Sequence, residues 1–204
     1  MFRVINFTHL LRYVAIATTG LSILAYMVAE HFMQADLALV RLLSVAPWFV
    51  LIVILTITTR STSRAIWRML RFFNSSLYPD LNGSWEGEIA LENGEITPAR
   101  AVIRQSLLEA QIDLHTSTSK SSTLETTPVV DAGQLKLYYT YRSTPSNVSW
   151  PSYTGSTILD IRNAVQKEGK QIELSGYYYT DRKTNGRISL RQTSADADVD
   201  VSYY

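Results

Sequence analysis

Two stretches without a charged residue constrain this chain more than any other feature of its sequence. Residues 13–29 and 42–59 contain no Asp, Glu, Lys or Arg. As α-helices rising about 1.5 Å per residue, each covers roughly 26 Å, close to the apolar thickness of a bilayer. Flanking residues extend the predicted helices to about 10–29 and 37–59, and Pro47 in the second is tolerated in a membrane helix. The pattern predicts a two-helix transmembrane hairpin.

A cleaved signal peptide is the alternative for the first stretch, because Arg3 and Arg12 precede its apolar run. That run has no clear small-x-small cleavage site, and a second apolar stretch follows after a short linker. The chain also lacks cysteine, which fits a reducing compartment better than export. We therefore expect both helices to be retained.

Arginines lie before the first predicted helix and after the second, but not in the linker between them. Cytoplasmic flanks carry the Lys/Arg excess of a membrane protein, and the linker 30–36 has neither residue. Both termini are therefore predicted to be cytoplasmic. The flanking arginines are Arg3 and Arg12 before the first helix, and Arg60, Arg64, Arg68 and Arg71 after the second.

The basic segment after the second helix has two interpretations. Its arginines recur at helical spacing among Ile66, Trp67, Leu70 and Phe73, which predicts a basic amphipathic helix at the inner leaflet. A solvated juxtamembrane linker explains the same charges. The first helix leaves a similar choice, because its small residues suit either contacts between subunits or packing within the hairpin. These residues include Ala17, Thr18, Gly20, Ser22 and Ala25.

Beyond residue 79 the hydrophobic period changes from helical to alternating. We divide the chain into a membrane module with a basic linker, 1–72, and a β-rich domain, 73–204. Turn residues separate the strands at 92–95, 131–133, 167–170 and 181–186, the last with an Asn-Gly pair. Successive hairpins predict an antiparallel, eight-stranded up-and-down β-barrel. The predicted strands are 83–91, 97–105, 109–116, 121–130, 134–141, 153–163, 171–179 and 187–192.

Alternation assigns the two faces of these strands. Trp85 and Ile89 share one face of the first strand, opposite Glu86 and Glu88. Leu135, Leu137, Tyr139 and Tyr141 likewise oppose Lys136, Tyr138, Thr140 and Arg142, and Leu159 and Ile161 oppose Asp160 and Arg162. We expect the apolar faces to point inward. An eight-stranded barrel is either filled by side chains or holds one small ligand, and the pattern leaves both possibilities open.

Tyrosines gather on or near the fifth to seventh predicted strands, close to basic residues. For any single tyrosine, β-propensity and core packing are a sufficient explanation. As a group, aromatic rings that stack on bases and cations that bind phosphates are suited to a nucleotide. The candidate ligand-binding residues are Tyr141, Arg142, Trp150, Tyr179, Arg182 and Lys183.

No pattern in the chain indicates catalysis. The three histidines have no metal-ligand spacing, and there is no phosphate loop, nucleophile elbow or cysteine. Residues 1–78 carry a net charge of +5 and residues 79–204 a net charge of −4, which argues against binding a DNA or RNA polymer. We expect neither an enzyme nor a resident metal or cofactor.

Two sequence segments carry a resemblance to a known family. After the two helices and the arginine-rich linker come LYPDLNGSWEGEI at 77–89 and SGYYYTDRKTNGRISL at 175–190. This order resembles the two-transmembrane, β-strand-rich effectors of bacterial cyclic-oligonucleotide anti-phage (CBASS) defence. The resemblance implies a cytoplasmic barrel that senses a cyclic dinucleotide made by a partner synthase. It also implies helices that oligomerise among the lipids of the inner membrane and disrupt it, causing abortive infection.

Three hypotheses for function follow from the sequence. The first is a membrane effector gated by a cyclic dinucleotide. The second is a membrane-anchored interaction module whose barrel is solid, and the third is a lipocalin-like carrier of an apolar molecule. Arginine and tyrosine converging on a cavity favour the first, a filled interior favours the second, and an all-apolar cavity favours the third.

Overall fold

The computed structural model describes residues 7–33, 39–73, 78–107, 110–166 and 169–204. It separates a helical unit, Ile5–Phe73, from a barrel unit that contains Asn74–Tyr204. Parts of several sequence predictions lie outside the described residues: Arg3, the linker at 34–36, the start of the second helix at 37–38, the start of the third strand at 109, and the turn at 167–168.

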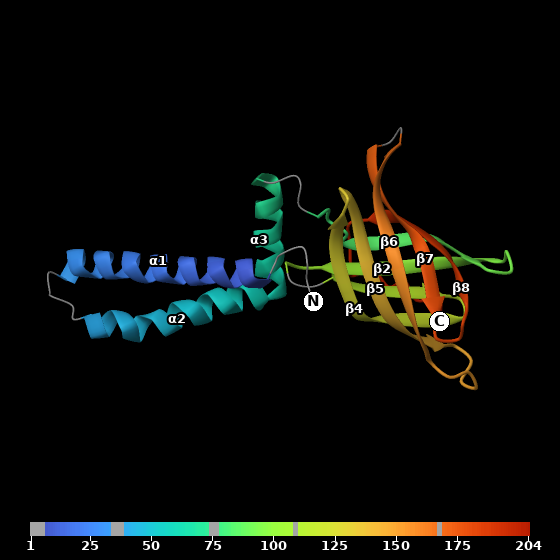
Figure 1. The fold of residues 1–204 in the computed structure, drawn as a ribbon, viewed down its shortest axis with the longest axis horizontal. Coiled ribbons are helices and arrows are strands. Elements are labelled where there is room, and N and C mark those ends of the chain that lie inside the picture. Colours follow the sequence, from blue (N-terminus) through green and yellow to red (C-terminus); the bar gives the residue numbers. More distant parts are fainter. Residues whose placement is uncertain (1–6, 34–38, 74–77, 108–109, 167–168) are drawn as a thin grey trace. The chain divides into compact units, whose positions relative to one another are not determined.

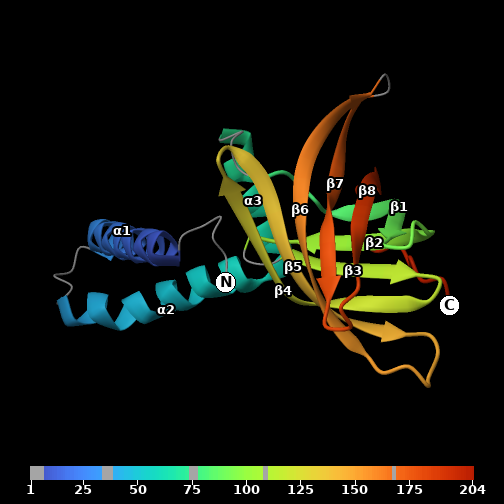
Figure 2. The same ribbon diagram turned by 45° about the vertical axis from the view of Figure 1, so that its right-hand side comes forward.

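Three helices form the first unit: α1 (Phe7–Met33), α2 (Leu39–Thr58) and α3 (Arg60–Phe73). α1 and α2 lie side by side and run in opposite directions (Figures 1 and 2). Hydroxyl groups in these helices donate to carbonyls one turn earlier, as in Ser22 to Thr18 at 2.8 Å and Thr56 to Ile52 at 2.7 Å. Such bonds satisfy polar side chains without a partner outside the helix.

Length and apolarity decide whether a helix can cross a bilayer. Within the described residues, no helix taken singly is long and apolar enough to do so. Pro47–Thr58 and Ser61–Phe73 together reach that length and composition, as a pair bent by 81°. The transmembrane hairpin therefore stays a prediction.

The second unit is a closed antiparallel barrel of eight strands in sequence order, and β1 pairs with β8 (Figure 1). The predicted barrel is confirmed, since the long alternating segments each supply one strand. The strands are β1 (Gly83–Leu91), β2 (Ile96–Gln105), β3 (Ala110–Thr116), β4 (Ser119–Asp131), β5 (Gln134–Pro145), β6 (Tyr153–Gln166), β7 (Gly169–Thr180) and β8 (Asn185–Ser194).

Three predicted turns are longer than the connections in the structure, since Asp131 lies in β4 and Gly169 and Lys170 lie in β7. In the third, Asn185 and Gly186 were expected within the turn but lie in β8 and pair with Tyr179 and Tyr178. The turn itself is residues 181–184, where Lys183 adopts a positive φ of 60°. The Asn-Gly pair is typical of a turn, but here the glycine is required by a close contact inside the barrel, described below.

The barrel interior is filled at one end, where β1 begins and β8 ends. Trp85 is fully buried there and its indole N–H donates to the Leu81 carbonyl at 3.0 Å. The face assignments from alternation are confirmed, because Leu137 and Tyr139 are buried whereas Glu86 and Glu88 are exposed. Other side chains with almost no exposure at this end are Leu81, Ile103, Ile112, Leu174 and Leu190.

Candidate functional site

A cavity of about 240 Å³ occupies the opposite end of the barrel. Its walls come from the ends of strands that meet at the β1–β2, β3–β4, β5–β6 and β7–β8 connections. The interior is therefore divided, with a packed half near the start of β1 and a hollow half at the other mouth. The lining residues are Ile89, Leu91, Thr97, Leu114, Thr116, Thr118, Ser119, Ser121, Tyr141, Tyr153, Thr157, Tyr178, Thr180, Arg182, Thr184 and Ile188.

Twelve of the sixteen residues that line the cavity carry a hydrogen-bond donor in the side chain, and the other four are Ile89, Leu91, Leu114 and Ile188. Eight of the lining residues are serine or threonine, three are tyrosine and one is arginine. Among the described residues that line the cavity, none is acidic. Hydroxyl and guanidinium groups are able to donate hydrogen bonds to an anion. The cavity is therefore suited to a ligand that is rich in acceptors and negatively charged.

Two tyrosines in the cavity lie against glycines on neighbouring strands. Tyr141 pairs with Gly155, and a Cβ at position 155 would fall well under 3.0 Å from the Tyr141 ring. Tyr178 pairs with Gly186, where a Cβ would strike the Ala90 carbonyl oxygen and would lie 2.7 Å from the ring and hydroxyl of Tyr178. Each glycine leaves the space that its partner's ring needs.

Burial raises the pKa of the Tyr141 phenol above its usual range, and the pKa of Tyr178 is raised for the same reason. Both hydroxyls therefore stay protonated at neutral pH and remain able to donate. Tyr141 also stacks on Tyr139, with ring centroids 5.0 Å apart. The stacking partner limits the ring's freedom, so its hydroxyl has a defined position at the cavity wall.

Arg182 is the cation of the cavity lining, and two contacts hold its side chain. Its guanidinium donates to the Pro151 carbonyl and lies 4.2 Å from the centroid of the Tyr153 ring. These contacts join the β7–β8 turn to the β5–β6 connection. Arg182 is thereby positioned before any ligand arrives, which lowers the entropy cost of binding.

The β7–β8 turn is also tied to the start of β6. The Asp181 carboxylate accepts hydrogen bonds from the Thr154 N–H at 2.9 Å and hydroxyl at 2.8 Å, and the Asp181 N–H donates to the Thr154 carbonyl at 3.0 Å. The Thr154 N–H, followed by its hydroxyl, lowers the pKa of Asp181. The turn that carries Arg182 is thus fixed to the barrel wall.

Residues 76–192 match the family model described as the Cap15 cyclic dinucleotide receptor domain. The matched range covers more than half of the 204 residues. The chain belongs to this Cap15 receptor family. A relative is CD-NTase-associated protein 15 from Staphylococcus schleiferi, which is 27% identical over 131 residues. The alignment covers 62% of this chain and 66% of that relative.

The cavity lies entirely within the part of the chain that matches the Cap15 receptor domain, since its lining residues run from Ile89 to Ile188. Residues 193–204 fall outside the match. Across the described residues, no group of three or more His, Cys, Asp or Glu side chains is arranged to hold a metal ion.

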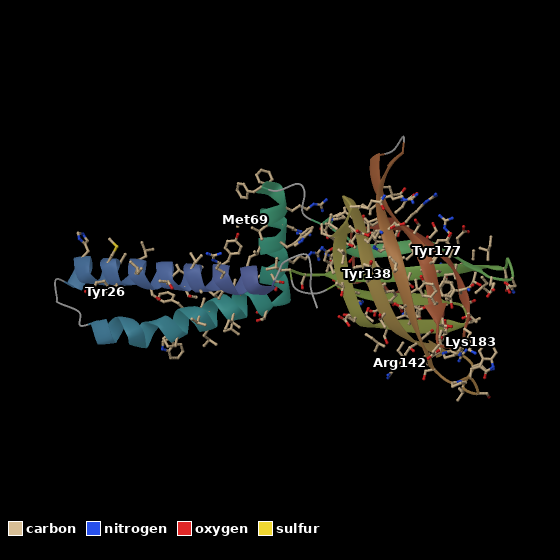
Figure 3. The ribbon with its side chains drawn as sticks, in the orientation of Figure 1. Tyr26, Met69, Tyr138, Arg142, Tyr177 and Lys183 are labelled. Atoms are coloured by element: carbon tan, nitrogen blue, oxygen red, sulfur yellow. The ribbon has the colours of Figure 1, made fainter. Side chains whose placement is uncertain are left out.

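The structure brings together only part of the predicted site. Tyr141 and Arg182 line the cavity. Arg142 and Tyr179 are exposed on the outer face of the barrel, because each lies next in sequence to an inward-pointing tyrosine and successive strand residues point to opposite faces. Trp150, which is 54% exposed, and Lys183 lie on the connections at the cavity's end (Figure 3 labels Arg142 and Lys183).

Sequence reasoning missed Tyr153, Tyr178 and the serine and threonine residues as site residues. The signal for Tyr178 was present, since it lies two residues from Gly176 and four from Leu174, both buried on the inward face. The hydroxyl residues carry no comparable signal. Threonine is common in strands for reasons of β-propensity, so its type alone does not mark a cavity.

Proposed function

We propose that this chain is a cyclic dinucleotide receptor that acts as a membrane effector in CBASS anti-phage defence. Its membership of the Cap15 receptor family supports the ligand class. The name of its relative, a CD-NTase-associated protein, supports a functional link to a cyclic-oligonucleotide synthase. In this proposal the chain binds the nucleotide without turning it over.

The donor-rich cavity is the observation that carries the proposal. A cyclic dinucleotide presents two anionic phosphodiesters, many acceptors and two aromatic bases. Arg182 and the hydroxyls would bind phosphate and ribose oxygens, while the rings of Tyr141, Tyr153 and Tyr178 would contact a base. A solid barrel lacks such a cavity, and the arginine and hydroxyl groups among the apolar side chains of its wall favour a ligand with both polar and aromatic parts over a wholly apolar one.

The volume of the cavity indicates how such a ligand would sit. About 240 Å³ lies below the roughly 300–1,000 Å³ of typical small-molecule sites. Part of a cyclic dinucleotide would therefore extend past the mouth toward the β5–β6 and β7–β8 connections. Trp150 and Lys183 lie on these connections, so both are proposed as contacts to the outer part of the ligand.

The effector step would require several subunits in the bacterial inner membrane. Two helices from one chain are too few to enclose a water-filled path, and their backbone polar groups are already satisfied within each helix. Thr18 and Ser22 are buried in the helical unit, whereas a Cβ at Gly20 would meet no atom within 4 Å. The face of α1 that carries Gly20 is therefore available for contacts between subunits, and ligand-driven assembly there would lead to membrane disruption and abortive infection.

Titration calorimetry tests the receptor step on the full chain in detergent, with a panel of cyclic dinucleotides and the matching linear dinucleotides as controls. We expect saturable heat and a raised melting temperature with at least one cyclic ligand and neither with its linear form. No heat and no thermal shift across the panel would refute the receptor proposal.

Dye-loaded liposomes test the effector step with the reconstituted full chain. We expect leakage and crosslinked oligomers to appear together when the cyclic ligand is added. Gly20→Leu should reduce both while leaving ligand binding intact, because the substitution is far in sequence from the barrel. Leakage without ligand, or binding without assembly and leakage, would count against this mechanism.

A further inference from the structure

The α3 helix separates charge from apolar surface more sharply than either longer helix. At about 100° per residue, Arg60, Arg64, Arg68 and Arg71 fall within one narrow sector of its circumference. Ile66, Met69, Leu70 and Phe73 occupy the opposite side, and Phe72 lies between that side and the arginines. A helix with a strongly charged face opposite an apolar face is typical of one lying in a membrane interface.

The apolar side of α3 is left uncovered. Phe72 is 86% exposed, Phe73 is 78% exposed and Met69 is 56% exposed. Large apolar side chains grouped on one face in this way mark an interaction surface. Figure 3 shows Met69 on the side of α3 from which α1 and α2 extend. An apolar medium around α1 and α2 would therefore also meet this face of α3.

The charge of α3 indicates the chemistry of its partner. Residues 37–79 contain five arginines and neither aspartate nor glutamate. Among the described residues, Arg64, Arg68 and Arg71 form no ion pair, and the buried Arg64 Nε has no hydrogen-bond partner. Arg71 lies 5.4 Å from the Trp67 ring. A row of guanidinium groups without counter-charges is complementary to phosphate groups.

The direction of α3 agrees with an in-plane position. α3 is bent by 81° from the second half of α2. Hydrogen bonds continue through the bend, from the Thr59 N–H to the Leu55 carbonyl and from the Ser63 N–H to the Thr59 carbonyl, both at 2.9 Å. The Thr62 hydroxyl also donates to the Thr56 carbonyl across the junction. If α2 crosses a bilayer, a helix at nearly a right angle to it lies along the surface.

We infer that α3 is a membrane-surface site that lies in the interface and binds the phosphate headgroups of anionic lipids through Arg64, Arg68 and Arg71. Met69, Phe72 and Phe73 enter the acyl region below those headgroups. This inference rests on the proposed membrane insertion of α1 and α2. It names a lipid class as the partner of α3 and distinguishes an interfacial helix from a solvated linker.

Single-cysteine labelling tests the orientation of α3, because the chain has no cysteine of its own. Met69→Cys and Phe73→Cys sample the apolar face, and Ser61→Cys lies beside the arginines. Each full-length variant is labelled with a fluorophore and reconstituted in vesicles of phosphatidylcholine with phosphatidylglycerol. We expect lipid-attached quenchers to reach positions 69 and 73, and aqueous iodide to reach position 61. Equal access of iodide to all three positions would overturn the inference.

Energy transfer from the Met69→Cys label to labelled lipids tests the headgroup preference. We expect higher transfer to phosphatidylglycerol than to phosphatidylcholine, with the ratio falling toward one as the arginines of α3 are replaced in turn by glutamine. Arg162→Gln, on the outer face of the barrel, is the matched control and should leave the ratio unchanged. Equal transfer to both lipids, or the same loss in the control, would refute an anionic-lipid site.

Calorimetry with the cyclic ligand on the same samples separates the two proposals. If the ligand binds but iodide reaches every labelled position of α3, only the lipid-site proposal is refuted. If α3 lies in the interface but no cyclic dinucleotide binds, only the receptor proposal is refuted.

Discussion

The ring of Tyr141 lies against Gly155, its direct partner on the neighbouring strand, in the space that any Cβ at that position would occupy. The Tyr141 ring forms part of the cavity wall, and the absence of a side chain at Gly155 leaves space for that ring. Gly186 likewise leaves room for the ring of Tyr178, its partner on β7, and for the Ala90 carbonyl on β1. The shape of the cavity therefore depends on two residues that have no side chain of their own.

Gly155→Ala should displace the Tyr141 ring and lower the free energy of unfolding by roughly 1–3 kcal/mol, the usual cost of overpacking. Chemical denaturation of the barrel measures the effect. In a Tyr141→Ala background the same substitution should cost much less, because the ring that it strikes is gone. Equal costs in both backgrounds would contradict the proposed contact.

Arg182→Ala should weaken cyclic dinucleotide binding by about 2 kcal/mol, roughly thirtyfold in Kd, if the guanidinium binds phosphate. Arg142→Ala is the matched control, since this exposed arginine lies on the outer face and should change affinity little. Calorimetry on both variants checks the expectation. A greater loss with Arg142→Ala would place the ligand outside the cavity.

Val201→Ala should destabilise the barrel by roughly 1–2 kcal/mol. Val201 is buried in a small cluster with Ala197 and Val102, through which the last residues of the chain pack on the outer face of β2. Val199→Ala removes the same atoms from a side chain that is 42% exposed and should have little effect. Thermal unfolding distinguishes the two, and similar losses would argue against the cluster.

His115 predicts a pH dependence of stability. Burial, with a further contribution from Lys120, lowers its pKa, and its buried Nδ1 has no hydrogen-bond partner among the described residues. The unfolded chain therefore binds a proton more readily than the folded chain does. Stability should be full above about pH 6.5, the ordinary histidine value, and should fall as the pH drops below it. Melting curves of His115→Gln should show a smaller fall, and parallel curves would contradict this origin.

Topology reporters at the C-terminus test the membrane orientation. Four arginines follow the second apolar stretch and none lies in the linker 30–36, so a reporter active only in the cytoplasm should work. One active only in the periplasm should stay silent. The reverse pattern would place the barrel outside the cytoplasm, where a cytoplasmic second messenger could not reach it.

Alternating hydrophobicity was sufficient to predict the barrel, because each strand has one buried face and a shift of one residue would expose it. The same rule limits the site prediction. Tyr141 and Arg142 are consecutive on β5, as are Tyr178 and Tyr179 on β7, so only one of each pair points inward. Residues chosen as a cluster in sequence were divided between the cavity and the outer surface.

Other features of the site depend on contacts between segments distant in sequence. Gly186 follows an asparagine and is typical of a hairpin turn, yet within β8 it is required by the Ala90 carbonyl on β1 and the Tyr178 ring on β7, both of which a Cβ would strike. Arg182 was predicted from its charge, but its support by Pro151 and Tyr153 depends on how two connections meet. No local pattern in the sequence reports such contacts.

The filled half of the barrel also limits how the proposed receptor would pass a signal out of the cavity. The chain enters the barrel just before Gly83, while the cavity lies at the other end of β1, whose nine residues span about 30 Å. Trp85 and its neighbours close the interior between these two points. In the proposed receptor, a signal from the cavity to the chain's entry point would therefore pass through solid protein, along the strands of the wall or through the closely packed side chains around Trp85, and not through an open channel.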